Sequence, residues 1–124
     1  MKVLRYRIED VEGVGILEND YIIPLHEFCA VNNIEENVKS LIENWDTLEK
    51  LIIEHIALKK GAFPLDQGIL LAPIPAPEKF LAIGMNYKKH RAESIDAGIT
   101  PPRNQMWFTK QVSCINDPNG DIIK

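Results

Sequence analysis

Apolar residues recur every three or four positions over residues 35–60, a spacing that places them along one side of a helix. The recurring positions are Val38, Leu41, Ile42, Trp45, Leu48, Leu51, Ile52 and Ile56. Two glutamates precede this stripe, and two lysines followed by Gly61 end it, as the helix dipole and a C-terminal glycine stop require. The pattern predicts one long helix that packs its apolar side against another element.

The residues before this helix follow a different period. In residues 1–10 the bulky apolar side chains Leu4, Tyr6 and Ile8 alternate with polar or smaller ones, which is typical of a one-sided strand. Two further short strands are expected at residues 14–17 and 21–23, the last stopped by Pro24. The sequence therefore predicts an α+β fold, in which a small antiparallel sheet carries the long helix.

Three prolines in five residues, Pro73, Pro75 and Pro77, predict a stiff extended segment and a domain boundary. We expect a small α+β domain over residues 1–77 and a second module over 78–124. The second module has predicted strands at 79–83 and 106–112, a short helix at 87–97 ended by Gly98, and a turn at 117–120 leading into Ile122 and Ile123. Its apolar positions are too few to close a core, so we expect an incomplete domain.

Charge and composition exclude several function classes. The chain has 14 Lys and Arg against 18 Asp and Glu, a net charge of −4, which excludes nonspecific nucleic-acid binding. Residues 1–78 carry seven basic and fourteen acidic side chains, whereas residues 79–124 carry seven and four. This contrast fits two modules, or charge clustered by chance on solvated faces. No apolar stretch approaches the roughly 18 residues that span a bilayer, so no membrane association is expected.

The N-terminus alternates charged and bulky residues and lacks an apolar signal core, so a cytoplasmic location is expected. Cys29 and Cys114 are far apart without a CxxC pattern, which argues against a zinc or redox site and favours two buried thiols. His26 and His55 are expected in capping or packing roles. The two tryptophans, Trp45 and Trp107, are core candidates, although Trp107 could also flank a pocket.

His90 and Glu93 are the first candidates for chemistry. They are three residues apart on the predicted short helix, so both side chains project from one face. A histidine beside a carboxylate can act as a general base whose proton the carboxylate orients or accepts. Any solvated helix with this spacing offers the same geometry, so the pair alone does not establish a catalytic site.

The sequence around this pair is more specific. The run IGMNYKKHRAES is followed by PPR and then by WFTK. This pattern resembles the opening of the catalytic domain in the fumarylacetoacetate hydrolase family, where a strand leads into Gly-x-Asn-Tyr-x-x-His-x-x-Glu, a proline-bearing loop and Phe-x-Lys. The matching positions here are Gly84, Asn86, Tyr87, His90, Glu93, Pro101 or Pro102, Phe108 and Lys110. The first 25 residues also resemble the small N-terminal domain of many bacterial members.

The resemblance implies an enzyme acting on C–C bonds of 2-oxo or β-diketo acids as a hydrolase, decarboxylase, hydratase or isomerase. It implies Mg or Mn as cofactor, and a dyad of His90 and Glu93 that activates water or transfers a proton. Lys110, and with less support Arg103, would bind a substrate carboxylate. Each has an alternative, since Lys110 could be a surface lysine at a strand end and Arg103 a solvated loop residue.

The family's metal ligands, a Glu-x-Glu pair and a later Asp, would lie beyond Lys124. From this resemblance we expect the chain to be the N-terminal portion of such an enzyme, to bind no metal alone and to be inactive alone. A homodimer or a complementing chain is expected. The alternative is a noncatalytic interaction or ligand-binding module that pairs through open strand edges, and a third is an unrelated α+β domain. The substrate is not identified by these residues.

Overall fold

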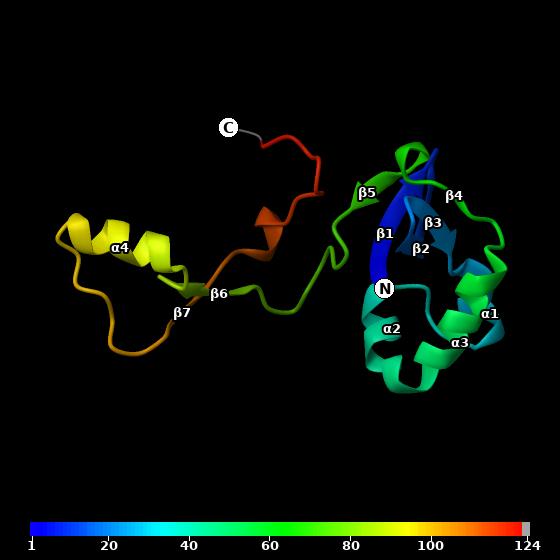
Figure 1. Ribbon diagram of the computed structural model, residues 1–124, viewed down its shortest axis with the longest axis horizontal. Coiled ribbons are helices and arrows are strands. Elements are labelled where there is room, and N and C mark those ends of the chain that lie inside the picture. The colour runs from blue at the N-terminus through cyan, green and yellow to red at the C-terminus, as the bar shows by residue number, and fades with distance from the viewer. Residues whose placement is uncertain (123–124) are drawn as a thin grey trace. The chain divides into compact units, whose positions relative to one another are not determined.

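The computed structural model describes residues 1–122 and divides into two compact units (Figure 1). The first unit comprises Met1–Pro75 together with the chain from Asn116 on, and the second comprises Ala76–Ile115. The α+β fold class predicted from the sequence is confirmed. The proposed domains 1–77 and 78–124 stay a prediction, because compactness does not by itself define a domain.

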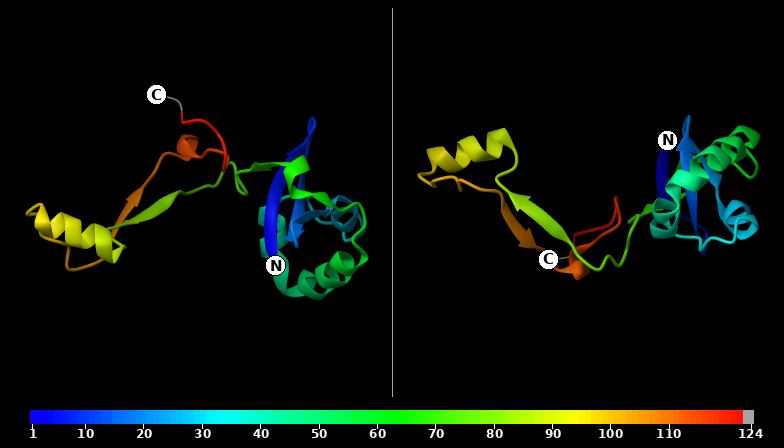
Figure 2. Two further views of the ribbon diagram at one scale, coloured as in Figure 1. Left: turned by 45° about the horizontal axis from the view of Figure 1, so that its top comes forward. Right: turned by 90° about the horizontal axis from the view of Figure 1, so that it is seen from below.

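The first unit is a five-stranded antiparallel sheet with helices on one face (Figure 2). In chain order its elements are β1 (Lys2–Ile8), β2 (Val11–Glu18), β3 (Tyr21–Pro24), α1 (His26–Val31), α2 (Val38–Glu43), α3 (Trp45–Leu58), β4 (Phe63–Pro64), a 3₁₀ turn at Leu65–Gln67 and β5 (Ile69–Leu71). The strand order is β4-β3-β2-β1-β5. All five strands are thus joined by antiparallel pairing between neighbours.

The main core lies between this sheet and its helices. In the antiparallel register Val3 faces Ile16 and Arg5 faces Val14, so these alternate positions share the helix-covered side. The buried cluster consists of Val14, Ile16, Ile23, Leu25, Phe28, Cys29, Val38, Leu41, Leu48, Ile52 and Ile56. Burying side chains of this size contributes roughly 1.5–3 kcal/mol each before conformational entropy is counted. Burial of this cluster is therefore the main contribution that stabilises the first unit.

The other face of the sheet has a smaller apolar contact built on glycine. Tyr6 meets Phe63 edge-on with ring centroids 5.2 Å apart. A Cβ on Gly15 would lie 2.9 Å from the Ile22 side chain and 2.9 Å from the Ile23 carbonyl oxygen. The sequence prediction that Leu4, Tyr6 and Ile8 form the apolar face of β1 holds for this smaller contact, whereas the main core is contacted from Val3.

The long helix predicted over residues 35–60 is two helices, α2 and α3, which corrects that expectation. Asn44 lies between them with φ −107° and ψ 13°, and its side-chain amide donates to the Ser40 carbonyl at 2.8 Å. Asparagine competes for backbone hydrogen bonds in this way and so ends helices. Asn37 begins α2 because its side chain accepts from the Ser40 amide at 2.7 Å.

The break also turns part of the stripe outward. Ile42 and Leu51 expose 57% and 42% of their surface, and Trp45 is only half-buried, whereas the other five stripe residues are buried. A short helix at the segment containing His26 was missed, since α1 is only six residues long and its apolar residues give no helical period of useful length.

The second unit contains three elements: β6 (Leu81–Gly84), α4 (Lys88–Asp96) and β7 (Met106–Thr109), followed by a 3₁₀ turn at Val112–Cys114. β6 and β7 pair antiparallel from Leu81 opposite Thr109 to Gly84 opposite Met106. The predicted strand at 106–112 is therefore shorter. Ile122 is not in a strand, and Ile123 lies outside the described residues.

The predicted glycine stop of α4 is confirmed. Gly98 has φ +77°, its amide donates to Ile95, and the Ile99 amide donates to Ser94 at 2.9 Å. These two bonds form the left-handed C-terminal motif that satisfies the last carbonyls of a helix. The chain is thereby turned back toward β7 through residues 100–105.

The second unit has almost no interior. Within Ala76–Ile115, all of which is described, Ser94 is the only buried residue. Apolar side chains of the β6–β7 ribbon are exposed: Leu81 50%, Met106 46%, Trp107 58% and Phe108 43%. Figure 2 shows α4 beyond one end of the ribbon rather than across its face. The expected packing of Trp107 is therefore wrong for this chain, as is the expected burial of Cys114.

A polar clasp closes the first unit where the chain leaves and returns. The Ala72 amide donates to Oδ1 of Asp117 at 2.6 Å, and the Ala72 carbonyl accepts from the Arg5 guanidinium at 3.1 Å. The segment beginning at Asn116 is thereby tied to the end of β5. Among residues 1–122, no helix is long and apolar enough to cross a membrane.

Candidate functional site

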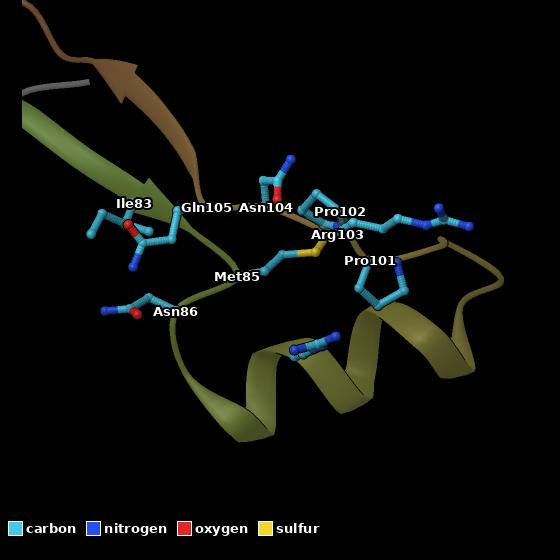
Figure 3. Close-up of a pocket in the computed structure, with 10 residues that line it drawn as sticks. Ile83, Met85, Asn86, Pro101, Pro102, Arg103, Asn104 and Gln105 are labelled. Atoms are coloured by element: carbon cyan, nitrogen blue, oxygen red, sulfur yellow. The ribbon is translucent and has the colours of Figure 1, made fainter.

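The second unit positions its polar side chains through an abrupt turn after β6. Met85 has φ 52°, a left-handed conformation unusual for a residue with a Cβ. The left-handed residue thus comes one position before the motif residue Asn86. Tyr87 is extended and precedes the first turn of α4. The chain thus changes direction within three residues and begins α4 beside the Gly84–Met106 end of the ribbon (Figure 3).

His90 and Glu93 lie on one face of α4, as predicted. Nδ1 of His90 and Oε2 of Glu93 are 4.0 Å apart, and the two side chains are 63% and 61% exposed. This distance is longer than a hydrogen bond, so the two groups face each other without being locked together. The Ser94 hydroxyl donates to the His90 carbonyl at 2.9 Å, which satisfies the polar group of this buried side chain.

A hollow of about 240 Å³ lies beside α4 (Figure 3). We call it the α4 hollow, and its lining is residues 83–86, Arg91 and residues 101–105. Figure 3 shows the Met85 side chain extending from the end of β6 to the proline-bearing loop at Pro102 and Arg103. The walls are mainly polar, with amides from Asn86, Asn104 and Gln105. Arg103, predicted to bind substrate, is part of this hollow.

His90, Glu93 and Lys110 are not part of the α4 hollow. The Lys110 amide donates to the Phe80 carbonyl at 2.8 Å, and its ammonium lies 5.7 Å from the centre of the Phe80 ring. Lys110 therefore lies at the Leu81–Thr109 end of the ribbon, whereas the turn into α4 leaves from the Gly84–Met106 end. The structure therefore pairs His90 with Glu93, puts Arg103 in the hollow, and holds Lys110 apart.

Sequence reasoning missed Arg91 as a lining residue. It lies inside the run HRAE, between the two motif residues His90 and Glu93. Its orientation follows from the helix, since one residue past His90 is about 100° around the axis, away from the face that His90 and Glu93 share. The available signal was the excess of basic residues in this half of the chain.

The first unit has its own titratable cluster, at the start of α1. Nδ1 of His26 lies 2.6 Å from Oε2 of Glu36, whose other oxygen accepts from the Val14 amide at 3.3 Å. The hydrogen bond and the charge of Glu36 raise the pKa of His26. Burial raises the pKa of the Cys29 thiol to about 11, and the charge of Glu36 adds to this. Cys29 is therefore an unreactive core thiol.

The remaining contacts of this cluster are structural. His55 shares a hydrogen bond of 3.0 Å with the Pro24 carbonyl and packs against Phe28, with ring centroids 5.4 Å apart. Glu27 pairs with Lys60 at 2.5 Å, which lowers the pKa of the glutamate through hydrogen bonding and charge. These bonds tie α1 to β2, β3 and the end of α3. The packing role predicted for His55 is confirmed, whereas His26 is the first residue of α1, makes no capping hydrogen bond and pairs with Glu36 instead.

The described residues do not fit the divalent metal that the family resemblance implies. Within residues 1–122, no group of three His, Cys, Asp or Glu side chains is placed to hold a metal ion. The pair of His90 and Glu93 offers only two donors, whereas a hard cation takes about six oxygen ligands. No chemical step is therefore assigned to a metal held by these residues.

Known proteins match the chain over much of its length. A 2,4-didehydro-3-deoxy-L-rhamnonate hydrolase of a Sphingomonas species is 34% identical over 80 residues, 60% of this chain and 27% of that protein. A fumarylacetoacetate hydrolase domain-containing protein 2 homolog of Dictyostelium discoideum is 29% identical over 113 residues, 89% and 34% respectively. These matches support the resemblance to the fumarylacetoacetate hydrolase family. No protein-family model matches it.

Solved structures agree in fold. The maleylpyruvate hydrolase of Sphingobium sp. SYK-6 has a TM-score of 0.63 at 23% identity, over 94% of this chain and 40% of that one. A putative HpcE protein of Mycobacterium smegmatis has a TM-score of 0.65 at 20% identity, over 95% of this chain and 39% of that one.

A mitochondrial oxaloacetate tautomerase of Bos taurus is a further sequence relative, 24% identical over 116 residues, 94% of this chain and 33% of that protein. The chain spans about a third of the length of the curated relatives it matches.

Proposed function

We propose that this chain supplies the small N-terminal domain and the proton-transfer segment of an enzyme that hydrolyses or isomerises a 2-oxo acid. The observation that carries the proposal is the facing pair of His90 and Glu93, set on α4 immediately after the β6 turn. Relatives named as hydrolases and tautomerases of such acids support it. Decarboxylation and hydration remain part of the same proposal as further outcomes of the family's chemistry.

The pair can move a proton in either reaction. With Nδ1 of His90 facing Glu93, Nε2 is the atom that accepts a proton from water or from the carbon next to an oxo group. Glu93 then stabilises the imidazolium and orients the ring. In a tautomerisation, loss of the proton from carbon leaves an enolate, and the same proton is returned to the enolate oxygen to give the enol, so no other reactant is consumed. A shortening of the present 4.0 Å separation would strengthen this arrangement.

The substrate's acid groups need cations, and the second unit has an excess of them. Residues 76–115 carry six Lys and Arg against three Asp and Glu. We propose Arg103 and Lys110 as the side chains that attract a substrate carboxylate. Mg or Mn, with ligands supplied from outside the described residues, would provide the Lewis acid that polarises the oxo group. The chain by itself is proposed to be inactive.

A chimera tests the dyad. The matched segment of the bovine oxaloacetate tautomerase is replaced by this chain, and oxaloacetate tautomerisation is followed with His90→Gln, Glu93→Gln and, as matched control, Lys89→Gln. Loss of a general base lowers kcat by about 10²–10⁴-fold. We expect that loss for His90→Gln, a smaller one for Glu93→Gln, and a nearly unchanged rate for the control. An active chimera whose rate survives His90→Gln would refute the role.

A second candidate is an interaction module that pairs through its open ribbon. The exposed Leu81, Trp107 and Phe108 favour it, since open strands with apolar side chains add partners readily. It predicts a homodimer or a complex with a complementing chain. Sedimentation of the purified chain over a range of concentrations tests it, with Trp107→Lys as the variant that should weaken association. A strict monomer at high concentration would exclude self-pairing.

A further inference from the structure

Two guanidinium groups line the α4 hollow from different parts of the chain. Arg91 comes from the middle of α4 and Arg103 from the loop that leads into β7. Within residues 1–122 neither side chain has an ion pair with a carboxylate. Two positive side chains on the lining of one hollow, with no acidic residue among them, make its potential positive and so favour a bound anion.

The rest of the hollow is suited to an oxyanion. Asn86, Asn104 and Gln105 contribute side-chain amides that can donate hydrogen bonds, and no acidic residue is part of the lining. The guanidinium fork matches a carboxylate with two parallel N–H···O bonds. The volume of about 240 Å³ admits a small molecule rather than a peptide or a nucleic acid.

We propose that the α4 hollow binds a small carboxylate, held between Arg91 and Arg103, on a side of α4 different from the one that carries His90 and Glu93. The proposal deepens the proposed function, on which it rests for the expectation that the ligand is an organic acid. The binding itself rests on the hollow alone. Arg103 thereby gains a partner, and Lys110 is assigned no part in this site.

The carboxylate could be one end of the substrate or a separate effector acid, and the test distinguishes these sources. Malonate is titrated into the isotope-labelled full chain at low, constant ionic strength, and amide chemical shifts are followed for residues 83–91 and 101–105. Oxaloacetate is then titrated in the same way. Sulfate serves as a probe of equal charge but tetrahedral shape.

Arg91→Gln and Arg103→Gln each remove one fork, and each should weaken malonate binding by about fivefold or more, since charge-assisted bidentate contacts are among the stronger hydrogen bonds. Both residues are exposed, so neither change should unfold the chain. Lys89→Gln removes the same charge from the same helix outside the hollow and should leave the affinity within about twofold, as expected for screened surface charge. Arg91→Lys should recover only part of the affinity.

His90→Gln and Glu93→Gln separate this proposal from the proposed function. Malonate binding that persists in both variants and disappears in the arginine variants supports a distinct carboxylate site, whether or not the chimera is active. Competition between oxaloacetate and malonate assigns the hollow to a substrate carboxylate, and failure to compete assigns it to an effector. Equal weakening in the Lys89 control, or binding retained in both arginine variants, would overturn the proposal.

Discussion

The two units of this chain treat their apolar side chains in opposite ways. In the first unit Leu41 and Ile52 have no exposed surface, whereas in the second Trp107 and Phe108 expose 58% and 43% of theirs. Both units contain antiparallel strands and a helix of nine residues or more. Regular backbone pairing therefore does not distinguish them. The difference lies in whether a helix lies across a sheet face, and it teaches that strand pairing can be present where side-chain packing is not.

The largest effect should come from a core truncation in the first unit. Ile52→Ala leaves a cavity between α3 and the sheet and should lower the free energy of unfolding by about 2–5 kcal/mol. Phe108→Ala in the second unit should change it by less than about 1 kcal/mol, because that ring is already exposed. Each unit has one tryptophan, so a Trp107→Phe background lets Trp45 fluorescence report the first unit in urea. Similar losses for the two variants would contradict the comparison.

A close backbone approach gives the next effect. Gly15→Ala places a Cβ against the Ile22 side chain and the Ile23 carbonyl, and overpacking against backbone should lower stability by about 1–3 kcal/mol. Gly98→Ala is the matched control in the second unit, where open space surrounds the glycine and only the φ of +77° resists the change. Its cost should be near 1 kcal/mol and confined to α4. Thermal unfolding by circular dichroism and by Trp45 fluorescence measures both.

Strain at Met85 allows a smaller test within the second unit. Met85→Val should weaken the ribbon by about 1 kcal/mol, since a β-branched residue tolerates a positive φ poorly. Met85→Gly should slow the exchange of the Lys110 amide, which is bonded to Phe80. Lys59 has the same left-handed conformation at the end of α3, so Lys59→Gly is the matched control. It should leave the exchange rate of the Lys110 amide unchanged. A Lys110 amide that exchanges equally fast in all three variants would show that Met85 does not limit the ribbon.

The smallest expected effect is a pH dependence of the first unit alone. Glu36 raises the pKa of His26, so the protonated histidine stabilises the folded state. That contribution is fully present below the ordinary pKa of 6.5 and is lost as the pH rises through the raised value. The unfolding midpoint of Trp45 fluorescence should therefore fall over this range. His26→Gln should flatten the curve, whereas His90→Gln should not; a curve unaltered by His26→Gln would refute the assignment.

Sequence reasoning succeeded where the pattern was long or dense with motif residues. The α+β class, the α4 stop at Gly98 and the apolar stripe through Leu41, Leu48 and Ile52 all followed from period and glycine position. It failed at Asn44, because a single side-chain hydrogen bond to Ser40 outweighed a helical period on both sides. Local competition of this kind carries no periodic signal.

The candidate site was predicted in part for the same reason. His90 and Glu93 are three residues apart, so helix geometry alone brings them to one face. That Arg91 and Arg103 line one hollow depends on a reversal of the chain at Met85 and on the loop after Gly98, and no spacing rule connects residues twelve positions apart across such a turn. The low burial of Trp107 also escaped prediction, since composition does not say which helix covers which strand.

The bond between Ala72 and Asp117 has a topological consequence. It brings together two points of the chain that are 45 residues apart, so the segment between them is a closed loop fastened at its neck. The entropy of closing such a loop grows only slowly with its length, so the neck tolerates large changes in what it encloses. Residues 76–115 are in this sense an insertion between two segments of the first unit. The Arg5 guanidinium donates to the Ala72 carbonyl and so connects the base of this insertion to β1.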